Sequence, residues 1–148
     1  MSNLASQFDI LKGWPNSSAL HYTFKEKDGV SPGSPITEGE IVAVEDESDV
    51  AVVDRYTSDL PASGNPDHPW IVIQGTDQAD GEFTGKAVCL KLRTGLIFLL
   101  ATSAVFNPED PVYANAGAIT PTDPNPTSVP IGKVLEVNPI DGYVVVES

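Results

Sequence analysis

The chain has 148 residues, and its 21 acidic and 8 basic side chains give a formal net charge of −13 at neutral pH. A chain of this length fits one domain whose core needs no disulfide or metal. A charge of this sign repels phosphate backbones and anionic lipid, so we expect neither nucleic acid nor membrane among its partners. The 13 prolines and 12 glycines are spread along the sequence and disfavour long helices.

The first 35 residues differ from the rest and are predicted to form an N-terminal arm ending in a hinge, GVSPGSP (29–35). The spacing of the apolar residues fits a short amphipathic helix that ends before Pro15, and an extended arm also fits. So short a stretch is marginal alone in water, so its apolar side chains must lie on the chain's own barrel or on another subunit. The candidate residues for binding another subunit or a partner protein are Leu4, Phe8, Ile10, Leu11 and Trp14.

From residue 20 onward the hydrophobic period is about two, which is typical of half-buried strands. We predict about eight to ten short strands, and an all-β fold with a small antiparallel β-barrel or sandwich and few or no helices, its main domain covering 36–148. The strand-like runs are 20–25, 40–45, 50–55, 70–74, 86–93, 111–116, 117–120, 130–137 and 142–147.

Three stretches give finer predictions. The acidic DESD (46–49) is expected to form the solvent-exposed tip of a hairpin. The run KAVCLKLR (86–93) places Val88, Leu90 and Leu92 on one face and a water-facing Cys89, Lys91 and Arg93 on the other. LIFLLATSAVF (96–106) fits a strand covered on both faces or a buried helix, and we favour a strand for 96–100 because its neighbours are strand-like. A long surface loop is expected over 56–69.

No group of residues is placed for chemistry. His21 and His68 have no neighbouring ligands at metal-site spacing, and the acidic 45–49 cluster lacks the glycine and terminal glutamate of a calcium loop. GEFTGK (81–86) is one residue short of a phosphate loop. The single cysteine cannot form an intramolecular disulfide, and the N-terminus lacks the pattern of a secretory signal. We therefore predict no catalytic residue, no cofactor and no metal, and a protein that is not an enzyme.

The C-terminal third resembles the small phage head decoration, or capsid cement, proteins. The resemblance is carried by DPVYANAGAIT (110–120), SVPIGKVLEV (128–137) and DGYVVVE (141–147), and more loosely by ITEGEIVAVE (36–45). The chain departs from the pattern of these proteins in its long 56–69 loop and in the unusually apolar segment LIFLLA (96–101).

The resemblance implies a non-enzymatic virion protein that is made in the bacterial host cytoplasm and sits on the outer surface of the capsid. It would bind the major capsid protein, commonly as a homotrimer at local threefold positions, and stabilise contacts between its subunits. An acidic, cysteine-poor β-domain suits an outer surface away from packaged DNA.

A second hypothesis is a carbohydrate- or receptor-binding β-module of a phage tail or cell surface. Sugar rings stack on aromatic faces, and Tyr56, Trp70 and Tyr113 are the available aromatic side chains. A small hydrolase is a third class, because any two carboxylates can meet in a fold, but nothing in the sequence singles out a pair.

Overall fold

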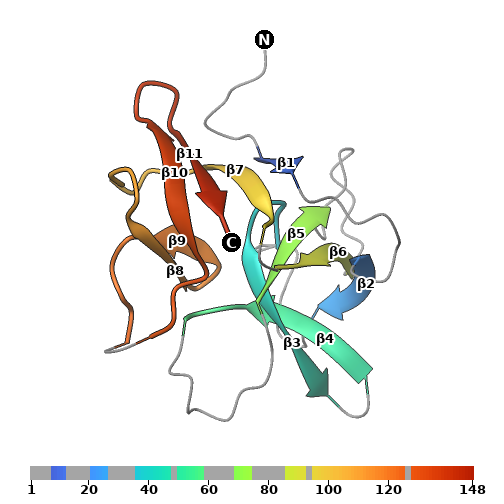
Figure 1. Ribbon diagram of the computed structural model, residues 1–148. Coiled ribbons are helices and arrows are strands. Elements are labelled where there is room, and N and C mark those ends of the chain that lie inside the picture. Colours follow the sequence, from blue (N-terminus) through green and yellow to red (C-terminus); the bar gives the residue numbers. More distant parts are fainter. Residues whose placement is uncertain are drawn as a thin grey trace. The chain divides into compact units, whose positions relative to one another are not determined.

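The computed structural model is all-β, and every regular element among its described residues is a strand (Figure 1). The described residues are 8–12, 21–26, 36–47, 50–58, 69–74, 86–92, 95–125 and 128–148. The strands are β1 (Phe8–Lys12), β2 (His21–Glu26), β3 (Ile41–Glu47), β4 (Val50–Arg55), β5 (Trp70–Gln74), β6 (Lys86–Lys91), β7 (Ile97–Ala101), β8 (Pro111–Asn115), β9 (Ala118–Thr120), β10 (Gly132–Asn138) and β11 (Tyr143–Glu147). The predicted fold class is confirmed.

The chain forms two compact units, which we call the barrel unit and the sheet unit. The barrel unit comprises Pro15–Tyr56 and Pro66–Lys91, and the sheet unit comprises Met1–Trp14, Thr57–Asn65 and Leu92–Ser148. The chain therefore passes between the units four times. This division differs from the predicted arm over 1–35 and barrel domain over 36–148. Within the first 35 residues, β1 pairs with β7 in the sheet unit, whereas β2 pairs with β6 in the barrel unit.

The barrel unit is a closed five-stranded barrel in the order β2-β4-β3-β5-β6, with β6 pairing back to β2. The predicted hairpin is confirmed, since β3 and β4 pair antiparallel down to Glu47 opposite Val50. One pairing departs from the antiparallel prediction: β2 and β4 run parallel, with Lys25 opposite Val52. Closure removes the free edges that an open sheet of this size would expose.

The barrel core is built from small and β-branched side chains, which fit the pleated interior of a narrow barrel. Its buried cluster is Ile36, Val42, Val53, Val72, Ala87 and Cys89, with Val44 and Trp70 packed against it. The predicted water-facing side of β6 is wrong, because Cys89 is fully buried in this cluster and Lys91 is half-buried. Leu90 on the opposite side is also fully buried, so β6 is covered on both faces at this point.

The sheet unit is a six-stranded antiparallel sheet in the order β1-β7-β11-β10-β8-β9. The strand predicted over 96–100 is confirmed as β7. Its Phe98 and Leu100 side chains are buried, and the three residues that alternate with them are half-buried. The valine run of β11 supplies three consecutive buried side chains, Val144 to Val146. β-branched residues favour such extended, packed positions.

Among the described residues, no helix is long and apolar enough to cross a membrane.

Candidate binding surface

The structure separates the predicted binding residues of the N-terminal segment. Leu4 and Trp14 lie outside the described residues, and Phe8 is described only as backbone of β1, opposite Leu100. Ile10 is buried, with 6% of its surface exposed, so it contributes to the core of its own unit. Leu11 is 50% exposed, so of the two side chains of the predicted set that the structure describes, it is the one available for contact.

The conformation of this segment explains why Ile10 is buried and Leu11 is exposed. Of the two predicted conformations, residues 8–12 take the extended one and form an edge strand against β7. The register shifts between Ile10 and Lys12, which leaves Leu11 as the extra residue of a β-bulge. A bulge breaks the alternation of faces, so Leu11 is directed away from the core.

The other residues singled out in the sequence form no chemical site in the described part of the chain. No group of three His, Cys, Asp or Glu residues there could hold a metal ion. His68 and the side chains of residues 45–49 lie outside the described part, and His21 is described only as backbone of β2. Burial raises the pKa of the Cys89 thiol to about 12. A thiol in that state is protonated at neutral pH and is a poor nucleophile.

The aromatic residues proposed for sugar stacking are all half-buried. Trp70 packs against the barrel core, and Tyr56 and Tyr113 are each partly covered. Aromatic side chains in such positions contribute mainly to packing.

A set of exposed large apolar side chains lies in the sheet unit, and the sequence analysis named only Leu11 among them. The five such side chains among the described residues are Leu11, Val105, Val129, Leu135 and Ile140. Leu135, like Leu11, is the extra residue of a bulge, at the register shift between Val134 and Glu136. The other three lie in turns and loops, where alternation of apolar and polar residues does not predict which side chains are exposed. The detectable signal is an apolar residue inside a turn sequence, as in NPIDG (138–142).

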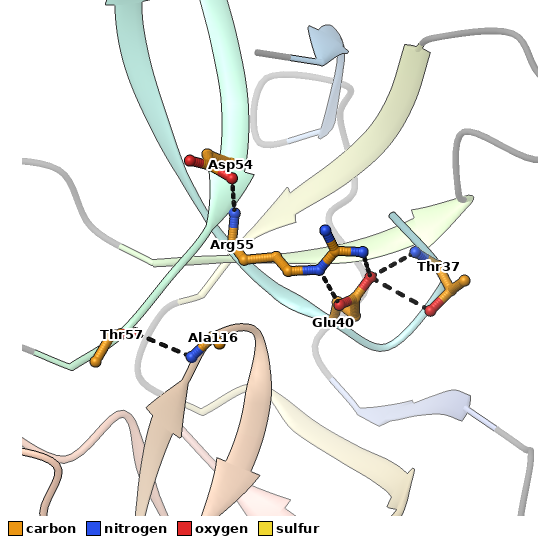
Figure 2. Close-up of polar contacts among 6 residues, drawn as sticks. All are labelled: Thr37, Glu40, Asp54, Arg55, Thr57 and Ala116. Atoms are coloured by element: carbon orange, nitrogen blue, oxygen red, sulfur yellow. Dashed lines mark hydrogen bonds and ion pairs between the residues drawn. The ribbon is translucent and has the colours of Figure 1, made fainter. Parts of the chain in front are cut away.

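Polar contacts fix the chain where it passes from one unit to the other. In the barrel unit, the guanidinium of Arg55 lies against the carboxylate of Glu40, with 2.7 Å between Nε and Oε1 (Figure 2). The same carboxylate accepts a hydrogen bond from the backbone N–H of Thr37 at 2.6 Å. Both ionic side chains are mostly covered, so removal of either one would leave a mostly covered charge, and the pair holds the end of β4 in place.

In the sheet unit, the next residues of the chain are bound along β8. Ser58 is fully buried, its N–H donates to the carbonyl of Ala114, and the Ala114 N–H donates to Ser58 Oγ at 2.9 Å. Thr57 Oγ1 accepts from the N–H of Ala116 (Figure 2). The Ser58 carbonyl accepts from the side chain of Asn125 at 2.9 Å. Every buried polar group of Ser58 therefore has a partner, which fixes this residue along β8 within the sheet unit.

Comparison with known proteins gives a structural likeness and no sequence family. No protein-family model matches the chain, and no curated protein matches it. Among solved structures, the chain is similar to the crystal structure of the N base of the head fiber gp8.5 in bacteriophage phi29, with a TM-score of 0.54 and 17% sequence identity. The likeness covers 86% of this chain and 92% of that one. At this identity it establishes a shared fold.

Proposed function

We propose that the protein is attached to the outer surface of a bacteriophage head and acts as a decoration, or cement, protein that stabilises contacts between major capsid protein subunits. The observation that carries the proposal is the fold likeness to the base of a phage head fiber, which extends over nearly the whole of both chains. It agrees with the independent resemblance of residues 110–147 to decoration proteins. Two separate lines, one from three-dimensional structure and one from sequence, lead to the phage head.

The physical properties of the chain support an adhesive role. Its net charge of −13 disfavours contact with packaged DNA and suits the outside of a shell. Five large apolar side chains in the described part of the sheet unit are available for contact. Apolar surface that is buried on binding contributes about 25 cal/mol per Å² to the binding free energy. Many copies bound at equivalent positions of a shell would add their contributions.

The test is binding to heads assembled without this protein. Purified protein is titrated onto such heads, and bound copies are counted after sedimentation. We expect saturable binding at a fixed number of copies per head, together with greater resistance of the heads to heat. Heads already saturated with the protein are the control and should take up no more. Failure to bind at micromolar concentration would reject the proposal.

The N-terminal segment is tested by substitution, because removal of residues 1–35 would also delete β1 from the sheet and β2 from the barrel. The change Leu11→Ser leaves the backbone pairing of β1 intact and removes its exposed apolar side chain. Weaker binding to heads is the result expected if this segment contacts the shell. Unchanged affinity would restrict the shell contact to other parts of the sheet unit.

A further inference from the structure

The β10–β11 hairpin and the 102–110 loop, which is hydrogen-bonded to it at both ends, present three exposed apolar side chains. Ile140 in the hairpin turn is 95% exposed, Val105 in the loop is 83% exposed, and Leu135 at the β10 bulge is 43% exposed. We call these three residues the hairpin-tip surface. The hairpin extends past the ends of β8 and β9 (Figure 1), and β10 pairs with β8 only at Gly132 and Lys133.

The turn that carries Ile140 is held rigidly. The side-chain oxygen of Asn138 accepts from the Asp141 N–H at 3.0 Å, and its amide nitrogen donates to the Asp141 carboxylate at 3.0 Å. The N–H of Gly142 donates to the Asn138 carbonyl at 2.9 Å, with Gly142 at a φ of 76°. Pro139 fixes a further backbone angle. A large apolar side chain is thus held in water on a turn that is already ordered.

The loop that carries Val105 is held in the same way. Its start is bound by the Thr102 N–H to the Gly142 carbonyl, and its end by the Glu109 N–H to the Val134 carbonyl, so it crosses the hairpin from the β11 side to the β10 side. Thr102 Oγ1 accepts from the Ala104 N–H at 3.0 Å, and the next apolar residue, Phe106, is buried with 3% exposed. Val105 is therefore presented between two fixed neighbours.

Preordered apolar side chains are suited to binding because little conformational entropy is lost when they are covered. The partner's chemistry follows from the charges beside them. The segments 102–110 and 133–142 carry four carboxylates, Glu109, Asp110, Glu136 and Asp141, and one basic residue, Lys133. A fitting partner has an apolar pocket whose rim is lysine or arginine. A second copy of this chain would bring the same carboxylates against each other, which is unfavourable.

We propose that the hairpin-tip surface is the part of this protein that enters the phage shell, with Ile140 and Val105 occupying an apolar, basic-rimmed pocket of a capsid subunit. This inference rests on the proposed function and specifies its contact. The four carboxylates beside this surface attract the protein to the basic rim of the pocket, and the side chains of Ile140 and Val105 supply the apolar area that is buried on binding.

The experiment measures binding to heads assembled without the protein, using wild type and the double variant Val105→Ser, Ile140→Ser. Both side chains are almost fully exposed, and the hydrogen bonds of both loops come from other residues, so the variant should fold normally. We expect its affinity for heads to fall roughly tenfold or more. The control is Val129→Ser, an exposed aliphatic at the opposite end of β10, which should bind like wild type.

A charge reversal tests the rim. Glu136→Lys places a positive charge beside Leu135, and Glu38→Lys makes the same change at an exposed position of the barrel unit. We expect Glu136→Lys to weaken binding more than Glu38→Lys, with the difference shrinking as salt is raised.

The outcomes separate the two proposals. If wild-type protein fails to bind heads, the proposed function is rejected. If wild type binds and the Val105, Ile140 variant binds equally well, the function stands and the hairpin-tip surface is overturned as its contact. If the variant loses self-association measured by mass in solution while head binding is unchanged, the surface joins copies of this chain and the inference is also overturned.

Discussion

The barrel unit and the sheet unit divide the chain's charge and its exposed apolar side chains unequally. The barrel unit has 13 acidic and 5 basic residues, a net −8, whereas the longer sheet unit has 8 acidic and 3 basic residues, a net −5. All five exposed large apolar side chains among the described residues belong to the sheet unit. The barrel unit therefore carries the larger share of the negative charge, whereas the exposed apolar side chains described lie in the sheet unit, a difference that the whole-chain composition averages away.

The largest expected effect comes from emptying each core in turn. Phe98 is fully buried in the sheet unit and Ile71 is fully buried in the barrel unit. Phe98→Ala should lower the free energy of unfolding by about 3–5 kcal/mol and Ile71→Ala by about 2–5 kcal/mol, because each leaves a cavity. Urea unfolding followed by circular dichroism measures both.

The same variants test whether the units unfold together. Because the chain passes between the units four times, we expect one transition, in which the Cys89 thiol of the barrel unit becomes reactive at the urea concentration where overall β-structure is lost. If Phe98→Ala leaves Cys89 protected after half the dichroism signal has gone, the two units are energetically separate.

A smaller effect is expected at Gly132, where two strands of the sheet unit approach closely. A Cβ at this position would lie 2.6 Å from the Glu147 carbonyl oxygen and 3.0 Å from a side-chain carbon of Val146. Gly132→Ala should lower the free energy of unfolding by about 1–3 kcal/mol, because a paired backbone must shift.

The control for Gly132 is Gly95→Ala in the same unit. Gly95 has nothing within 4 Å of an added Cβ but has a φ of +92°. Its cost is backbone strain alone, about 1 kcal/mol. Equal losses at both positions would mean that the close approach of β10 to β11 relaxes at no cost.

A pH effect should be specific to the barrel unit. Burial raises the Cys89 pKa from 9.0 to about 12, so the unfolded chain loses this proton at a lower pH than the folded one. The contribution of the protonated Cys89 thiol to the free energy of unfolding is fully present below about pH 9. It falls by about 1.4 kcal/mol per pH unit as pH rises from 9 towards 12. Comparing urea unfolding of wild type and Cys89→Ala between pH 8 and 10.5 isolates it. Parallel curves for the two proteins would contradict this account.

The smallest effect is expected in the β8–β9 hairpin, where Ala116 has a φ of 49° and Gly117 a φ of 88°. Glycine accepts this left-handed conformation without a Cβ penalty, so Ala116→Gly should raise the free energy of unfolding by about 0.5–1 kcal/mol. The same substitution at Ala118, in β9, should lower it by a similar amount. Thermal unfolding of both variants should shift in opposite directions, and a shift in the same direction would count against backbone strain at Ala116.

Local pattern predicted the strands because period-two hydrophobicity and turn residues act over a few neighbours. The β3–β4 hairpin and the β7 strand follow from such signals. The water-facing side assigned to Cys89 failed for a related reason: alternation separates the two faces of a strand but does not say which is interior, and β6 is covered on both. The bulges at Leu11 and Leu135 depend on pairing with distant strands, so the sequence named Leu11 as a contact residue without the bulge that exposes it and did not reveal Leu135.

The division into units was also beyond local reading. Contacts such as Ser58 with Ala114 join residues far apart in the sequence, and the parallel pairing of β2 with β4 closes the barrel across an intervening strand. Composition changes along the chain indicated a boundary near Ile36, whereas the units are assembled from separated segments. The hairpin-tip surface combines both difficulties, because Val105 and Ile140 lie in a loop and a turn, Leu135 lies at a bulge, and the loop is placed by long-range hydrogen bonds.

The interleaving of the two units has a consequence for inheritance. A single genetic breakpoint anywhere between residues 15 and 91 leaves the sheet unit's first segment, Met1–Trp14, on one side and its last, Leu92–Ser148, on the other. A replacement of one unit by a homologous counterpart would need several simultaneous crossovers. The barrel unit and the sheet unit should therefore be inherited together, and related proteins should contain both units or neither.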